Sequence, residues 1–245
     1  MDVTAFQLSL FLGAAFAAAF VAGVSGFAFA LIAAAVWLHV LTPLETATLI
    51  IGYGLIVQGY GFWKLRHAFN WQRLWPYIAG GAPGVAIGVY VLRWANPSYV
   101  RMGIAAFLVA FSIYGLARPA LRPVRAGAIA DTAVGFLSGM VGAIAGFPGI
   151  LIVIWCGLRG WSKDEQRGVF QPASVAMLAM SAIALGVTGS VALNTIYLFL
   201  IGLPALLLGT WAGFALYGRI DEDGFRRIVL WLLLAAGVFL IASLH

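Results

Sequence analysis

Residues 6–40 form an apolar run that is too long for one straight crossing of a membrane. As a continuous helix the run would reach about 50 Å at 1.5 Å per residue, whereas the hydrocarbon core of a bilayer is about 30 Å thick. It must tilt steeply, or break and turn back. A second overlong run covers 129–158, and three ordinary apolar stretches follow each run. These stretches cover 45–63, 74–93 and 99–117, then 167–190, 194–217 and 226–244.

The composition agrees with an integral membrane protein. Hydrophobic residues make up 63% of the chain and charged residues 9%, unlike soluble domains with about 45–50% apolar and 25% charged residues. We expect an all-α polytopic protein with one membrane domain over 1–245. The formal charge of +6 lies in short loops, so it indicates topology and not nucleic-acid binding. With a lone Cys156 and no disulfide or multi-cysteine metal site, no cofactor is expected.

The basic residues favour an even number of crossings in the run 129–158. If that run enters and returns on one side, the four loops 64–73, 118–128, 158–167 and 218–227 share a face. That face then holds all the basic residues except Arg93 and Arg101. Because basic loops prefer the cytoplasmic side, this arrangement predicts a re-entrant helical hairpin. Asp2 precedes the first apolar run without a Lys or Arg, which is not typical of a cleaved signal peptide.

Weak self-similarity relates the two halves of the chain. At an offset of 120, Gly26-Phe27 meets Gly146-Phe147, Thr42 meets Ser162, and Glu45 meets Glu165. Such symmetry is typical of duplicated transporters. We extend the hairpin to the run 6–40 by this repeat alone. The prediction is two inverted repeats, about 6–117 and 129–244, each with a re-entrant hairpin plus three crossings, and both termini outside the cytoplasm.

Glycine and proline place the hairpin tips. Gly23 and Gly26 suit a turn inside the first run, and Pro148 suits the first turn of a returning half-helix, because its missing N–H has no partner there anyway. We expect these half-helices to begin near Phe27 and Pro148. Their free N–H groups and partial positive charge would together hold an anion near the midplane.

The segment Gly23-Val-Ser-Gly26 has two other interpretations. An intramembrane serine protease would use Ser25 as nucleophile, but no histidine lies centrally in a later span and the equivalent position is Ala145. Simple helix packing through small residues is the stronger alternative, since small-xxx-small pairs such as Gly84 with Gly88 are common in membrane helices. A membrane scaffold or receptor whose hairpins merely pack is therefore a further functional alternative.

Polar residues in the spans complete the predicted site, with interhelical hydrogen bonding as the competing explanation. The predicted substrate-binding residues are Ser25, Gly26, Phe27, Tyr53, Gln58, Gly146, Phe147, Pro148, Gly149, Gln171 and Ser174. Glu45 and Glu165 instead fit capping boxes with Thr42 and Ser162. Asp131 is expected to cap the second hairpin, with proton coupling as the alternative. Tryptophans near the span ends are expected as interface anchors, namely Trp37, Trp63, Trp71, Trp75, Trp94 and Trp161.

The paired segments Ala22-Gly-Val-Ser-Gly-Phe27 and Val141-Gly-Ala-Ile-Ala-Gly-Phe-Pro-Gly149, each followed by a short loop and a helix, carry a family resemblance. The chain resembles the TauE/SafE sulfite exporters, also called the toluenesulfonate uptake permease family, over nearly its whole length. The resemblance implies a secondary transporter, not an enzyme, for sulfite, sulfonates, sulfoacetate or other small organic anions. It further implies a bacterial cytoplasmic membrane as the location, coupling to an ion gradient and a homodimer.

Overall fold

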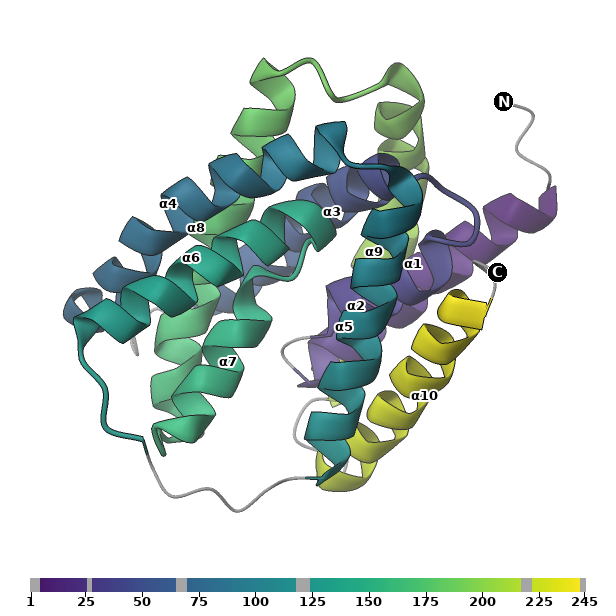
Figure 1. The fold of residues 1–245 in the computed structure, drawn as a ribbon. Coiled ribbons are helices and arrows are strands. Elements are labelled where there is room, and N and C mark those ends of the chain that lie inside the picture. Colours follow the sequence, from purple (N-terminus) through teal and green to yellow (C-terminus); the bar gives the residue numbers. More distant parts are fainter. Residues whose placement is uncertain (1–4, 26–27, 65–69, 118–123, 217–221, 243–245) are drawn as a thin grey trace. The chain divides into compact units, whose positions relative to one another are not determined.

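The computed structural model describes residues 5–25, 28–64, 70–117, 124–216 and 222–242. These ranges contain ten α-helices and no strand, which confirms the all-α prediction (Figure 1). The helices are α1 (Ala5–Ser25), α2 (Phe29–Trp37), α3 (Pro43–Lys64), α4 (Trp71–Trp94), α5 (Pro97–Ala117), α6 (Ala128–Ala145), α7 (Pro148–Leu158), α8 (Lys163–Val187), α9 (Leu193–Leu216) and α10 (Glu222–Ala242).

Both overlong runs break where the sequence predicts. α1 ends at Ser25 and α2 begins at Phe29, while α6 ends at Ala145 and α7 begins at Pro148. The chain also reverses at each break. The indole N–H of Trp37, at the end of α2, donates to the carbonyl of Phe11 on α1 at 3.2 Å. The indole of Trp155 on α7 likewise donates to Asp131 near the start of α6, at 2.7 Å.

The two arms of each hairpin differ in length. α1 has 21 residues and α6 has 18, so each is about 27–32 Å long and can cross a bilayer alone. α2 and α7 have only 9 and 11 residues. Six spans qualify by length and composition, and they include α1 and α6 but not α3 or α10. These candidate spans are Phe6–Val24, Trp71–Trp94, Pro97–Ala117, Ala128–Ala145, Gly168–Val187 and Leu193–Leu216.

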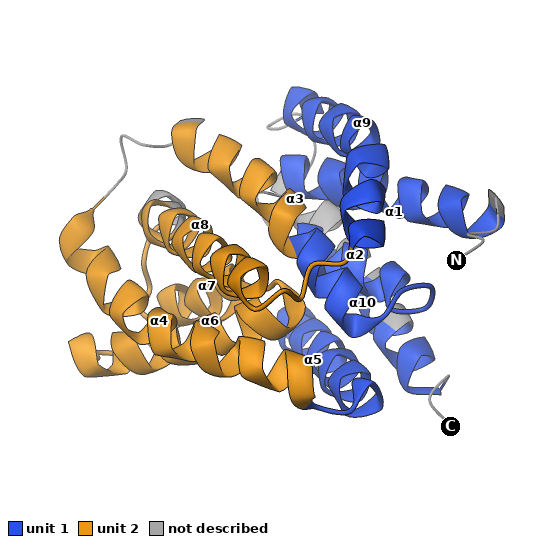
Figure 2. Ribbon diagram, turned by 90° about the horizontal axis from the view of Figure 1, so that it is seen from above, with its two compact units in different colours: residues 1–50, 95–119, 193–245 blue, residues 51–94, 120–192 orange. Residues whose placement is uncertain are grey.

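The helices group into two compact units (Figure 2). Unit 1 comprises 1–50, 95–119 and 193–245, and so contains α1, α2, α5, α9 and α10. Unit 2 comprises 51–94 and 120–192, and contains α4, α6, α7 and α8; α3 begins in unit 1 and continues in unit 2 from residue 51. Each unit therefore joins the hairpin of one half of the chain to helices from the other half.

Glycine allows the closest helix contact of unit 2. Gly80, Gly84 and Gly88 of α4 face backbone carbonyls of α6. These carbonyls belong to Thr132, Phe136 and Met140. A methyl group at any of the three glycines would overlap the carbonyl oxygen, so only glycine lets the two backbones approach this closely. The interpretation of Gly84 and Gly88 as helix-packing residues is confirmed, and Gly80 extends the same contact.

Unit 1 contains the equivalent contact. Gly209 and Gly213 of α9 face the carbonyls of Phe16 and Phe20 on α1. At the offset of 120 found in the sequence, Phe16 and Phe20 correspond to Phe136 and Met140 of α6. The long arm of each hairpin therefore presents matching carbonyls to a glycine-lined helix from the other half. This agreement supports the internal duplication.

Gly23 belongs to this packing and not to the turn. It lies inside α1, and a Cβ there would come within 2.9 Å of the Gly213 backbone. The expectation that Gly23 forms the hairpin tip is therefore wrong. The packing interpretation of this glycine is the one that the structure supports. A glycine before a break and a glycine at a helix contact have the same appearance in sequence.

Two local predictions have different outcomes. The capping boxes are confirmed: Thr42 and Ser162 exchange hydrogen bonds with Glu45 and Glu165 through backbone and side chain in both cases. The interface role is wrong for Trp37, which is fully buried with its ring stacked on Phe11 at 4.9 Å. The other predicted anchors on α3 and α4 are exposed, namely Trp63, Trp71, Trp75 and Trp94.

Candidate functional site

The tip of the α6–α7 hairpin is a buried, tight turn in unit 2. Gly146 ends α6 in the left-handed conformation, with φ 78°. Phe147 follows, and Pro148 is the first residue of α7. All three are buried. Because glycine adopts positive φ without a Cβ clash, the chain can reverse here in only two residues.

The first turn of α7 lacks a side-chain cap. Pro148 has no N–H, and Phe147 provides no side-chain cap for the helix. The N–H of Ile150 makes only a long bond of 3.4 Å to the carbonyl of Phe147. A helix terminus with uncapped N–H groups carries partial positive charge, and it attracts an anion when it is shielded from water.

Ser174 of α8 lies beside this turn, and Gln171 is three residues earlier in α8. A Cβ at Gly149 would be 2.5 Å from the Ser174 hydroxyl oxygen, so this hydroxyl lies against the α7 backbone. Ser174 is fully buried and Gln171 is 4% exposed. Among the residues that the structure describes, neither Ser174 Oγ nor Gln171 Oε1 has a hydrogen-bond partner. Buried polar atoms are usually paired, so both atoms require an explanation. Of the two, only the Ser174 hydroxyl can donate to an anion, because the Gln171 amide oxygen is an acceptor.

α3 supplies the remaining predicted residues of this unit. It packs against α8 through two glycines: a Cβ at Gly54 would lie 3.1 Å from Leu178, and one at Gly61 would lie 3.0 Å from the Gln171 amide nitrogen. Tyr53 is fully buried next to Gly54, and Gln58 is half-buried. The structure thus brings α3, α7 and α8 together around Gln171 and Ser174.

The corresponding tip in unit 1 falls on Ser25, Gly26 and Phe27. Gly26 and Phe27 lie outside the described residues, and Ser25 is the last residue of α1. Ala28 then precedes α2 in the left-handed conformation, with φ 75°. A shared anion chamber formed by both tips stays a prediction, as does the inverted orientation of the repeats.

Comparison with known proteins identifies the family. Residues 11–240 match the family model described as "Sulfite exporter TauE/SafE". The chain belongs to the TauE/SafE family. No curated protein and no solved structure matched the chain. Together with the six candidate spans, TauE/SafE membership makes the chain an integral membrane protein and implies a membrane transporter of sulfur-containing anions.

TauE/SafE membership agrees with the resemblance stated on the two glycine-rich segments, since both lie within the matched residues. It is also consistent with a transporter, because the family is one of transporters. The homodimer and the bacterial cytoplasmic membrane stay predictions.

One cluster in this TauE/SafE chain was not predicted. Asp131 does not cap α6, whose N-cap is Gly127, and instead binds Tyr77, Trp155 and Arg159. The sequence signal that was available is the acidic residue inside an apolar run, together with Trp155 and Arg159 one helical turn apart. A second ion pair joins Arg73 to Glu165 at 2.7 Å. The Arg73 hydrogen bond, followed by the Ser162 cap, lowers the pKa of Glu165 to about 2.

Proposed function

We propose that the chain is a secondary transporter of small sulfur-containing or organic anions such as sulfite, sulfonates and sulfoacetate, working in a bacterial cytoplasmic membrane. The anion would bind at the N-terminus of α7, next to Ser174 and Gln171. One observation carries the proposal: the buried Ser174 hydroxyl, without a hydrogen-bond partner among the described residues, lies against the uncapped first turn of α7.

The chemistry of these groups favours an oxyanion. The first-turn amides, the Ser174 hydroxyl and the amide nitrogen of Gln171 are all hydrogen-bond donors, and a sulfite or sulfonate group offers several acceptor oxygens. Dipoles and neutral donors hold an anion more weakly than a buried arginine or lysine. Release after each crossing is therefore feasible, which transport requires.

The position of the site supports transport more than passive packing. α8 carries Pro172 between Gln171 and Ser174, which removes one helical hydrogen bond and leaves the carbonyl four residues earlier without its usual partner. Broken or irregular helices at membrane depth are tolerated where they line a cavity or are buried in protein. Discontinuous helices that present their N-termini to anionic groups recur in secondary transporters.

The test is anion flux into liposomes reconstituted with purified protein. Sulfite, sulfoacetate and benzenesulfonate are offered to the wild type and to Ser174→Ala. We expect the wild type to move at least one of the three anions. Ser174→Ala should raise its KM about ten-fold, because a hydrogen bond to a charged group contributes about 1.5–3 kcal/mol.

Ser181→Ala is the matched control. Ser181 is also a fully buried serine of α8, but its hydroxyl donates to the Met177 carbonyl of its own helix at 2.8 Å. We expect its KM to stay close to that of the wild type. If the two alanine variants behave alike, the anion site is not at α7. If no flux of any of the three anions occurs, the scaffold or receptor alternative is favoured instead.

A further inference from the structure

Asp131 is the only acidic residue within the six candidate membrane spans, and it is 8% exposed. An acidic group in such a span is costly and usually has a functional partner. The proposed anion site does not use it, because the site needs donors and not a carboxylate. The contacts of Asp131 therefore indicate a second role for unit 2 besides binding the anion.

Four hydrogen bonds surround the Asp131 carboxylate, and all come from α4 or from α7 and its C-cap. The Tyr77 hydroxyl of α4 donates at 3.0 Å and the Trp155 indole of α7 at 2.7 Å. One guanidinium nitrogen of Arg159, the C-cap of α7, donates to both carboxylate oxygens at 2.8 Å. Asp131 thus connects the beginning of α6 to the end of α7.

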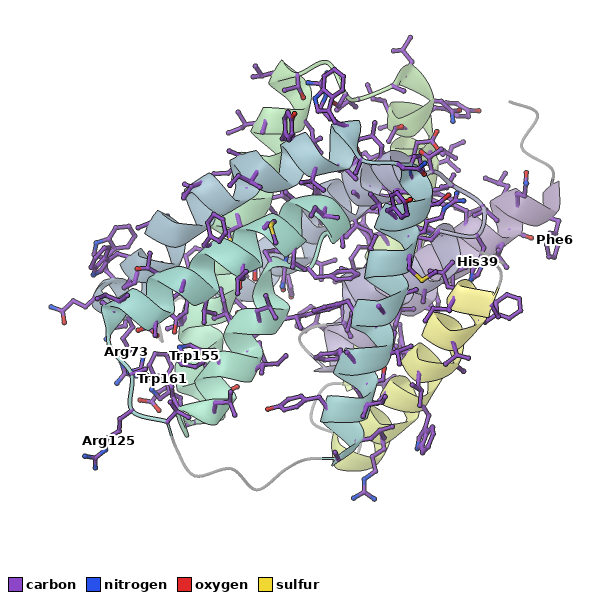
Figure 3. All side chains as sticks on the ribbon, in the orientation of Figure 1. Phe6, His39, Arg73, Arg125, Trp155 and Trp161 are labelled. Atoms are coloured by element: carbon purple, nitrogen blue, oxygen red, sulfur yellow. The ribbon has the colours of Figure 1, made fainter. Side chains whose placement is uncertain are left out.

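The connection continues away from Asp131. Two guanidinium groups contact the Trp161 ring, with that of Arg159 at 4.9 Å and that of Arg73 at 4.8 Å from the ring centre. Arg73 in turn pairs with Glu165 of α8. Figure 3 shows Arg73, Trp155 and Trp161 gathered at the same end of the unit. Two ion pairs therefore lie near the end of α7, and only the pair with Asp131 includes a residue of that end, Arg159.

The hairpin of unit 1 shows that the short arm can pack on the long arm without an ion pair. There the end of α2 returns to α1 through the Trp37 ring, which stacks on Phe11 and donates to the Phe11 carbonyl. Phe11 corresponds to Asp131 at the repeat offset of 120. Because a buried ion pair is weak evidence for stability and apolar packing closes the other hairpin, the ion pair in unit 2 calls for a reason other than stability.

We propose that Asp131 is the positioning residue of α7, and that its contact with Arg159 opens and closes during the transport cycle. α7 has 11 residues and is about 16 Å long, so it moves as one rigid element. The ion pair holds one end of this helix and the proposed anion site lies at the other. Opening the pair lets α7 turn away from α6 and redirects its N-terminal amides.

The chain contains its own reporter for this motion. Cys156 is the only cysteine; it lies on α7 beside Trp155 and is fully buried. Its alkylation by N-ethylmaleimide therefore requires α7 to open. We expect slow labelling of the wild type and labelling about ten-fold faster or more in Asp131→Asn, which keeps the shape of the side chain and removes its charge.

Because the role of α7 depends on the proposed anion site, sulfoacetate and benzenesulfonate are added in a second measurement; sulfite is avoided because it reacts with maleimides. A ligand that binds the closed state pulls α7 back, so saturating anion should slow the labelling of Asp131→Asn toward the wild-type rate. Asp131→Asn should also raise the KM of transport, because less of the protein holds the site in its binding conformation. A purely structural role predicts neither anion protection nor a selective change in KM.

Glu165→Gln is the control, since it breaks the exposed ion pair of Arg73 and leaves Asp131 intact; it should label as slowly as the wild type. Equal labelling of Asp131→Asn and wild type would overturn the proposal, and so would fast labelling that a transported anion does not slow. If Asp131→Asn does not fold, Trp155→Phe removes one donor and keeps the ion pair. It should label a few-fold faster, and labelling of this variant at the wild-type rate would equally reject the proposal.

The two proposals can fail separately. Absence of anion flux in the wild type would reject the anion site, whereas the labelling rates measured without anion would still test the ion pair.

Discussion

The two hairpins reach similar geometry with different chemistry. In unit 1 the short arm α2 closes on α1 through stacked aromatic rings and one indole hydrogen bond to a backbone carbonyl. In unit 2 the short arm α7 closes on α6 through a carboxylate that accepts from an indole, a phenol and a guanidinium. A tryptophan donates to residue 11 in one hairpin and to residue 131 in the other, and these two positions are equivalent in the repeat.

The difference suggests separate roles for the two hairpins. The contacts of an aromatic stack in an apolar interior weaken gradually as the rings move apart. Such a stack contains no charged group for which an anion or another polar group could compete. A charged pair has two discrete arrangements, bound and separated, and polar or anionic groups can compete for its members. We infer that α2 is the more static arm and that α7 is the arm whose position changes.

The largest effect should come from removing the carboxylate of unit 2. Asp131→Ala leaves Arg159 without its partner in a site where the two side chains are only 11% and 19% exposed. We expect a loss of about 3 kcal/mol in the free energy of unfolding. Trp37→Phe in unit 1 keeps the aromatic contact and loses one hydrogen bond, and should cost about 1 kcal/mol. Thermal unfolding of both variants in one detergent measures the difference, and equal losses would contradict the distinction between the hairpins.

The next effect tests the feature that the hairpins share. Gly84→Val places a side chain against the Phe136 carbonyl at the contact of α4 with α6. We expect a cost of about 2–3 kcal/mol, because neither backbone can move away easily. Gly209→Val makes the same change between α9 and α1 and should cost a similar amount. Gly103→Val is the control, since a Cβ there would have no atom within 4 Å. If only one of the two variants lost stability, the glycine contacts of the two units would not be equivalent.

A smaller effect of opposite sign is expected at the two turns. Ala28 and Gly146 both have a left-handed backbone, with φ 75° and 78°. For an L-residue this conformation costs about 1–2 kcal/mol, of which the greater chain entropy of glycine offsets part. Gly146→Ala should therefore destabilise the protein by about 1 kcal/mol, whereas Ala28→Gly should stabilise it by up to about 1 kcal/mol. Thermal melts test the signs, and two changes of the same sign would contradict the matching turns.

Features that depend on chain length or on neighbours in sequence were predictable from the sequence. The breaks follow from runs that exceed the bilayer thickness, and the start of α7 from a proline suited to a first helical turn. The capping boxes with Glu45 and Glu165 follow from residues three positions apart. Gln171 and Ser174 were selected as polar residues in an apolar span, and both are buried, while their role in binding an anion stays a prediction.

Features that depend on which helices pack together were not predictable. Tyr77 and Asp131 are 54 residues apart, and nothing local relates them. Trp37 at the end of an apolar run resembles an interface anchor, but the reversal of the chain folds it onto Phe11. Gly23 has the same appearance whether it bends the chain or contacts another helix, and only the position of Gly213 decides between these roles.

The smallest effect concerns the two capping boxes, which are alike except for one ion pair. Glu165 is bound by Arg73 as well as by its cap, and its pKa is lowered from 4.5 to about 2. A carboxylate with a lowered pKa contributes stability above the pKa of the unfolded state, and this contribution disappears as the pH falls from 4.5 toward 2. The effect of Glu165→Gln on unfolding should therefore be the same at about pH 7 and about pH 5, and should shrink only in stronger acid. Both glutamates are partly exposed, so salt should weaken the Arg73 contribution while leaving the Thr42 cap of Glu45 unchanged. If the effect of Glu165→Gln instead disappeared already between about pH 7 and pH 5, Arg73 would not bind this carboxylate, and α8 would have only its cap to fix its start.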